Sequence, residues 1–121
     1  LEKELEELSK AQDNLNEKLS KEKDNISKFE KQQDSINKRF DELKNELKEL
    51  DKLNQELDKP MSLDTNQDLQ QEIDKSLNDS KENVSKNSKN KASQSQKNAS
   101  KQMKQLASEL NQQQENSKAK G

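Results

Sequence analysis

The sequence contains no cysteine, histidine, tryptophan or tyrosine. Thiol nucleophiles, imidazole bases and the usual zinc ligands are therefore absent, and no disulfide indicates the compartment. The only glycine, Gly121, ends the chain, so no glycine-rich loop can hold a phosphate. We accordingly expect no catalytic residue, no cofactor site and no metal site, and we do not expect this chain to be an enzyme.

Hydrophobic residues are scarce as well, at 23% of the 121 residues, whereas 40% are charged. A globular core of ordinary thickness needs more apolar volume, so two interpretations stay open at this point: disorder, or long helices that each bury one narrow stripe. No apolar run reaches the roughly 18–20 residues needed to cross a bilayer. The charged start LEKELEEL is unlike a signal peptide, and a first residue other than methionine suggests an excised piece.

A heptad repeat without a phase break runs through residues 1–58 and decides between these interpretations. A disordered chain does not keep a seven-residue register over eight heptads, so we expect one helix here, with an apolar seam that packs against a partner helix. The strict repeat also favours a left-handed supercoil. The seam of this half consists of Leu1, Leu5, Leu8, Leu15, Leu19, Ile26, Phe29, Ile36, Phe40, Leu43, Leu47, Leu50 and Leu57.

Polar residues interrupt this seam at Gln12, Glu22, Gln33 and Asn54. Polar seam residues lower stability but penalise wrong registers, so one interpretation is that they set the register of the helices. The other is that they face water at a loosely packed seam. The sequence leaves both open.

Pro60 disfavours helical geometry at Lys59 and predicts a turn over residues 59–64. Ser62, Asp64 or Thr65 can cap the helix that follows, and Thr65 with Asp68 resembles a capping box. We expect this second, Ser/Ala/Lys-rich helix over residues 65–118, fraying after about residue 111. Its seam consists of Leu69, Ile73, Leu77, Val84, Ala92, Ala99, Met103, Leu106 and Leu110.

The predicted fold is all-α: two long helices in an antiparallel coiled-coil hairpin, with further oligomerisation left open. A bend at residues 59–64 would place Leu47 near Leu77 and Phe40 near Val84. Bulky residues in the middle of the first helix would then face small ones such as Ala92 and Ala99, which fills a seam well.

The net charge is −2, but six lysines stand together without an acid between Glu82 and Glu109. They form a candidate basic surface of Lys86, Lys89, Lys91, Lys97, Lys101 and Lys104. Lysines can neutralise phosphates in a salt-sensitive way. The stretch has no arginine and no aromatic residue for base stacking, and its lysines spread around the helix, which favours an ordinary solvated face.

The stretches LDKPMSL at residues 57–63 and KASQSQKNASKQMK at residues 91–104 resemble part of a family of large, uncharacterised Bacteroidetes-type envelope proteins. Those proteins combine membrane-spanning segments with long helical regions, and the resemblance covers most of residues 45–110. It implies a cell-envelope or periplasmic location and no particular activity.

The leading functional prediction is a non-catalytic structural or protein-interaction module, a spacer or docking arm of a larger protein. Its partner would be protein, either a second copy or other helices of the parent protein. Two alternatives stay open: a parallel homodimeric coiled coil through residues 1–58, and a weak lysine-driven binder of nucleic acid or anionic membrane.

Overall fold

The computed structural model describes residues 2–21, 26–57 and 64–120, and in these residues the chain is almost entirely helical. The helices are α1 (Glu2–Lys21), α2 (Ile26–Gln55), α3 (Gln67–Ser85) and α4 (Lys89–Lys120). No strand occurs in this part of the chain. The all-α prediction is confirmed.

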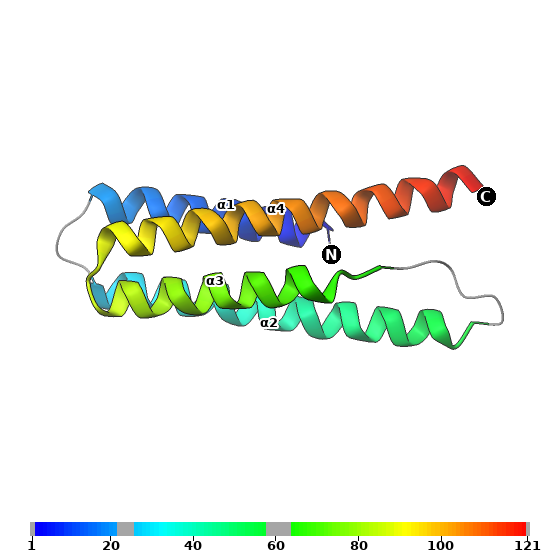
Figure 1. Ribbon diagram of the computed structural model, residues 1–121, viewed down its shortest axis with the longest axis horizontal. Coiled ribbons are helices and arrows are strands. Elements are labelled where there is room, and N and C mark those ends of the chain that lie inside the picture. Colours follow the sequence, from blue (N-terminus) through cyan, green and yellow to red (C-terminus); the bar gives the residue numbers. More distant parts are fainter. Residues whose placement is uncertain (1, 22–25, 58–63, 121) are drawn as a thin grey trace.

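The four helices form one bundle in which each helix runs antiparallel to the next (Figure 1). α1 packs against α2 and α4, and α3 packs against α2 and α4, so the helices close into a ring. This is the up-down-up-down arrangement of four-helix bundles. Every helix therefore has two neighbours, and each needs only one apolar stripe to share a common core.

The prediction of two long helices is wrong, because the described residues form four. α1 ends at Lys21 and α2 begins at Ile26, so residues 1–58 do not form the single helix that the heptad repeat predicts. The parallel dimer through residues 1–58 requires that same continuous helix. The repeat keeps its phase from α1 to α2, and phase alone does not reveal that the chain reverses between them.

The predicted second helix is broken at residues 86–88, where the backbone makes a helix-ending turn. Asn87 adopts a left-handed conformation with φ of 59°. Its N–H donates to the carbonyl of Val84 at 3.0 Å, and the N–H of Ser88 donates to that of Asn83 at 2.8 Å. This pair of bonds is the Schellman motif, which satisfies the last carbonyls of a helix. The carbonyl of Ser88 then accepts from Ala92 N–H and opens α4.

The predicted turn at residues 59–64, with Pro60, lies outside the described residues except for Asp64. α3 is capped by Asn66, which is none of the three candidates Ser62, Asp64 and Thr65: Asn66 Oδ1 accepts from the N–H of Leu69 at 3.2 Å. Asn66 has φ of 50°, which asparagine tolerates better than threonine because a β-branched side chain clashes there.

The register of α3 on α2 also differs from the prediction. Asn37 Nδ2 donates to the carbonyl of Leu77 at 3.1 Å, whereas the hairpin pairs Leu77 with Leu47. The ion pairs of Asp34 with Lys81 and of Lys44 with Asp74 are displaced from the predicted pairing in the same direction. In keeping with this shift, α2 extends past the point where α3 starts (Figure 1).

The core collects the apolar stripes of all four helices. Its buried members are Leu5, Leu8, Leu15, Leu19, Phe29, Ile36, Phe40, Leu43, Leu47, Leu69, Ile73, Leu77, Val84, Ala92, Ala99, Met103, Leu106 and Ala107. Burial of each Leu, Ile or Phe contributes about 1.5–3 kcal/mol, so this shared core is the main source of stability.

The helices differ in length, and this shapes one end of the bundle. α1 begins about halfway along the molecule, whereas α2 and α4 continue to its far end (Figure 1). α4 is helical to Lys120, beyond residue 111, where the sequence predicts fraying. The end of α2 therefore projects past the start of α1.

Candidate interaction surfaces

A layer of glutamines crosses the middle of the core. Gln12 of α1, Gln33 of α2 and Gln96 of α4 are each 0% exposed. Gln12 and Gln33 exchange two hydrogen bonds, of 3.0 and 2.7 Å, and Gln96 Nε2 donates to Gln33 Oε1 at 3.0 Å. Gln33 Nε2 also donates to Asn37 Oδ1 at 3.0 Å. Gln33 thus uses both of its N–H donors and both acceptor sites of its oxygen.

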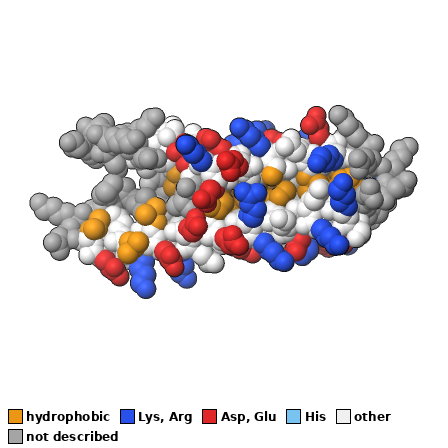
Figure 2. Space-filling view, turned by 180° about the vertical axis from the view of Figure 1, so that it is seen from behind, with side chains coloured by type: hydrophobic (Ala, Val, Ile, Leu, Met, Phe, Trp, Pro, Cys, Tyr) orange, Lys and Arg blue, Asp and Glu red, His pale blue; other side chains and the backbone are white. Residues whose placement is uncertain are grey.

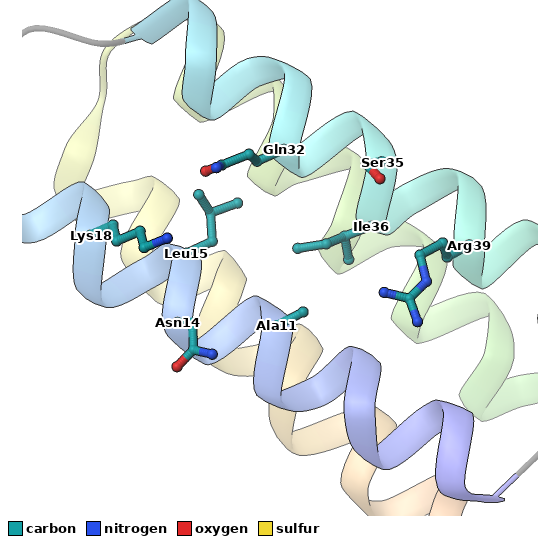
Figure 3. A pocket seen from close by; sticks show the side chains of 8 residues that line it. All are labelled: Ala11, Asn14, Leu15, Lys18, Gln32, Ser35, Ile36 and Arg39. Carbon is teal, nitrogen blue, oxygen red and sulfur yellow. The ribbon is translucent and has the colours of Figure 1, made fainter.

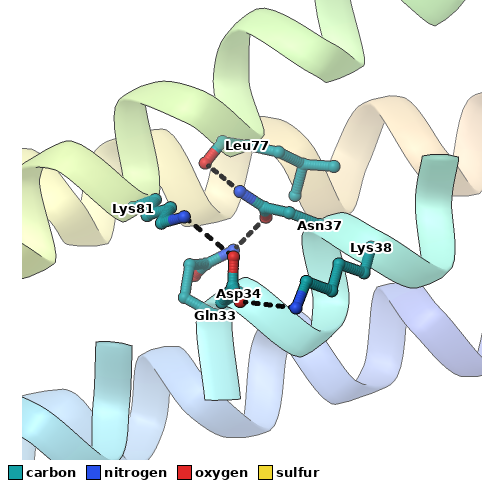
Figure 4. A network of polar contacts seen from close by, with 6 residues as sticks. All are labelled: Gln33, Asp34, Asn37, Lys38, Leu77 and Lys81. Atoms are coloured by element: carbon teal, nitrogen blue, oxygen red, sulfur yellow. Dashed lines mark hydrogen bonds and ion pairs between the residues drawn. The ribbon is translucent and has the colours of Figure 1, made fainter. Parts of the chain in front are cut away.

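This layer answers the question that the sequence leaves open about Gln12 and Gln33, because neither side chain faces water. Asn37 carries the layer on to the carbonyl of Leu77 and so to α3 (Figure 4). All four helices are therefore joined at one level. A shift of any helix by one turn would leave buried amides without partners, which costs about 1–3 kcal/mol for each group.

Beside the layer, Asp34 joins α2 to α3 at the surface. Its carboxylate accepts from Lys81 Nζ at 2.8 Å and lies 3.3 Å from Lys38 Nζ (Figure 4). The hydrogen bonds from Lys81 and Lys38 hold the pKa of Asp34 below its ordinary value of 3.8. The lowered pKa of Asp34 is therefore explained by the ion pairs that join α2 to α3.

Lys44 makes a second ionic link between α2 and α3. Its ammonium group bonds to Asp74 and lies 3.2 Å from Asp41. Partial burial works to lower the pKa of Lys44, but the hydrogen bonds to Asp74 and Asp41 outweigh it, and the pKa is raised. The same ammonium lies 5.8 Å from the ring centroid of Phe40, within reach of a cation–π contact.

A shallow groove of about 300 Å³ lies between α1 and α2 (Figure 3). Leu15 and Ile36 point toward one another across its floor, and Lys18 and Arg39 stand over it. Ala11, Asn14, Gln32 and Ser35 complete the lining. The side chains of Leu15 and Ile36 are already almost fully buried, so this groove offers mainly polar contacts.

A stripe of leucines runs along the projecting end of α2 and into the turn that follows it. Leu50, Leu53 and Leu57 are 40%, 61% and 52% exposed, and they are the large hydrophobic side chains that the described part of the chain exposes. Figure 2, seen from behind Figure 1, shows hydrophobic side chains at the surface toward the end where α2 projects. We refer to these three residues as the leucine stripe.

The predicted seam residues are placed as follows. Those with described side chains are buried, apart from Leu110, which is partly buried against the core, and Leu50 and Leu57, which lie in the leucine stripe. Leu1 and the side chain of Ile26 lie outside the description. Leu53 is not a seam position of the heptad repeat, so the repeat alone does not identify the stripe.

The candidate basic surface does not form a single cluster of available charge. Lys86 Nζ lies 2.7 Å from Glu82, and Lys104 Nζ lies 3.1 Å from Asp13 of α1. The hydrogen bond from Lys86 lowers the pKa of Glu82. The side chains of Lys91, Lys97 and Lys101 are exposed on α4, and that of Lys89 is half-buried.

The sequence interpretation missed two further polar contacts in the core. Ser9 of α1 and Ser100 of α4 are buried, with hydroxyl oxygens 2.9 Å apart, and each hydroxyl also reaches the backbone carbonyl of the other residue. Gln96 was missed as well. A signal for both existed: Gln96 and Ser100 lie on the same face of α4 as Ala92, Ala99 and Met103, at helical spacing.

Two kinds of site are absent from the described residues. No group of three or more acidic side chains there is arranged to hold a metal ion. None of the described helices is long and apolar enough to span a bilayer.

Comparisons with known proteins returned no matching family model, no matching curated protein and no matching solved structure.

Proposed function

We propose that this chain is a non-catalytic helical module that serves as a spacer or docking arm of a larger protein. The observation that carries the docking role is the leucine stripe on α2. The other large hydrophobic side chains in the described part of the chain are turned inward, and these three are left at the surface.

The geometry of the stripe suits binding by another helix. Leu50 and Leu53 lie three positions apart on one face of α2, which ends at Gln55, and Leu57 follows four positions later in the turn after the helix. An apolar row of this kind is the usual contribution of one helix to a helix–helix interface. Covering a leucine that is now exposed contributes up to about 1.5–3 kcal/mol, so a partner helix gains from this surface.

The spacer role rests on the shape of the bundle. α2 has 30 residues and α4 has 32. At about 1.5 Å per residue, each extends for about 45–48 Å. Polar bonds join all four helices at one level, and they stiffen the bundle against sliding. A rod of this kind keeps the parts of the larger protein at its two ends at a fixed distance from each other.

The docking role is tested with a synthetic amphipathic helix that carries leucines at three- and four-residue spacing and glutamine at its flanking positions. We expect it to bind the full chain in isothermal titration calorimetry, and we expect Leu53→Gln to weaken binding about tenfold or more, because it removes a central apolar contact. Lys52→Gln, one residue away on another face, is the matched control and should bind as the wild type does. Equal binding to all three chains, or no binding at all, would remove the docking role.

We further propose that the parent protein is a membrane-anchored envelope protein. Support for this comes solely from the resemblance of residues 57–63 and 91–104 to that class. Expression of the full-length parent protein followed by fractionation tests it. Recovery with the membrane fraction is expected, and recovery of the whole protein in the cytosolic fraction would contradict the proposal.

A further inference from the structure

The leucine stripe lies on the side of α2 that faces α1, beyond the stretch of α2 that α1 covers. Ala11 and Arg39 line the same groove between α1 and α2, as do Leu15 and Ile36. α1 begins at Glu2, about halfway along the molecule, whereas α2 continues to Gln55 at the far end (Figure 1). The last part of α2 therefore has no α1 beside it.

The stripe and the groove occupy the same face of α2. Gln32, Ser35 and Arg39 line the groove. Their spacing places them on the same side of α2 as Leu50 and Leu53 of the stripe. A helix that covers the stripe would therefore extend the line of α1 and complete the fourth corner of the bundle at this end.

The charges around this vacant line are acidic. Glu46 and Glu49 are exposed and lie within about a quarter turn of the centre of the stripe on the helical wheel of α2, and Glu56 is exposed in the turn that follows α2. Lys48 and Lys52 lie more than a third of a turn away from that centre. At the end of the vacant line, the first turn of α1 carries Glu2 and Glu4, with Lys3 between them. A helix placed here would have carboxylates along its α2 side and at the end that meets α1.

These charges disfavour a second copy of the chain as the occupant. If two stripes packed about a two-fold axis near Leu53, Glu49 of one copy would face Glu56 of the other, because contacting residues would be symmetric about that axis. Like charges that face each other across an interface are unfavourable. Basic flanks would instead meet complementary charge.

We propose that the leucine stripe binds a basic amphipathic helix of a partner protein, which lies along α2 in the line of α1. This inference rests on the proposed docking role and adds the charge of the partner. The stripe supplies the apolar contact, and Glu46, Glu49 and Glu56 select lysine or arginine at the flanking positions of the bound helix.

The test uses three synthetic helices of about three heptads with identical leucine rows and with lysine, glutamine or glutamate at the flanking positions. We expect the lysine helix to bind the full chain about tenfold more tightly than the glutamine helix, since it can form three exposed ion pairs that each add modestly to affinity. The glutamate helix should bind most weakly. Added salt should remove most of the difference, because it screens exposed charges.

The matched variant is the triple change Glu46→Gln, Glu49→Gln and Glu56→Gln, with helicity checked by circular dichroism. It should lose the preference for lysine and keep its affinity for the glutamine helix. Three outcomes would overturn the inference in different ways. Equal affinity for the three helices removes the charge selection and leaves the docking role intact. No binding of any helix removes both. A concentration-dependent dimer that Leu53→Gln abolishes identifies a second copy as the occupant.

Discussion

At the scale of single residues, the bundle is specified by a few buried polar groups as much as by its leucines. Gln33 is completely buried and fully hydrogen-bonded to α1, α4 and its own helix. An apolar seam of leucines tolerates sliding by a heptad, because every layer resembles the next. A layer of paired amides does not, since a shifted partner leaves donors and acceptors without bonds.

Replacing Gln33 with alanine should destabilise the fold clearly. The change leaves buried atoms of Gln12, Gln96 and Asn37 without a partner, and each such group costs about 1–3 kcal/mol. Urea unfolding followed by circular dichroism measures the loss. Gln105→Ala, at an exposed position of α4, is the matched control and should change the free energy of unfolding by less than about 0.5 kcal/mol. Equal effects of the two changes would contradict the role assigned to the layer.

Asp34 predicts a particular dependence of stability on pH. Its pKa is held below 3.8 in the folded chain by Lys81 and Lys38, so the unfolded chain binds the proton more readily. The resulting stabilisation is present above pH 3.8 and is lost as the pH falls through the folded pKa. The wild type and Asp34→Asn should therefore differ in free energy of unfolding at neutral pH and converge in acid. A difference that stays constant from pH 7 to pH 2 would contradict this.

At the scale of helices and turns, the sequence shows where helices lie more clearly than where they end. The heptad repeat in residues 1–58 continues in phase from α1 into α2, and a repeat has the same phase whether the chain goes straight on or turns back. The break at Asn87 had a local signal, an asparagine between a helix end and Ser88, but asparagine and serine are so frequent in this half that the signal does not stand out.

The turn at Asn87 predicts substitution effects of opposite sign at two neighbouring asparagines. Asn87→Ala should cost about 1 kcal/mol, because alanine resists the left-handed conformation that Asn87 adopts. Asn90→Ala, in the first turn of α4, should stabilise the chain by a few tenths of a kcal/mol, because alanine is the better helix former. Thermal unfolding of the two variants checks the pair. A gain at position 87 would show that the helix does not end there.

At the scale of the whole molecule, the composition and periodicity predict an all-α chain and most of the side chains that turn inward. Phe29, Phe40 and Leu47 are seam positions of the repeat, and all three are buried. The number of helices could not be predicted, since a narrow apolar stripe serves a two-helix seam and a four-helix core equally well. The sequence analysis did not single out Leu53, because this residue lies outside the heptad repeat. Its exposure depends on the arrangement of the helices, since α2 projects past the start of α1.

The arrangement of α1 beside α2 is the claim on which the vacant line, the leucine stripe and the docking proposal all depend. The chain has no cysteine, so two engineered cysteines can carry spin labels without interference. Lys3→Cys and Lys48→Cys place labels on exposed positions at the start of α1 and on the neighbouring part of α2.

Pulsed electron paramagnetic resonance on this doubly labelled chain measures the separation directly. Neighbouring helices in a bundle lie about 8–10 Å apart, and with the label linkers the distance should fall below about 30 Å. A continuous helix through residues 1–58, in a hairpin or in a parallel dimer, would separate the two positions by about 68 Å along its axis. A single population near the longer distance would contradict the four-helix bundle.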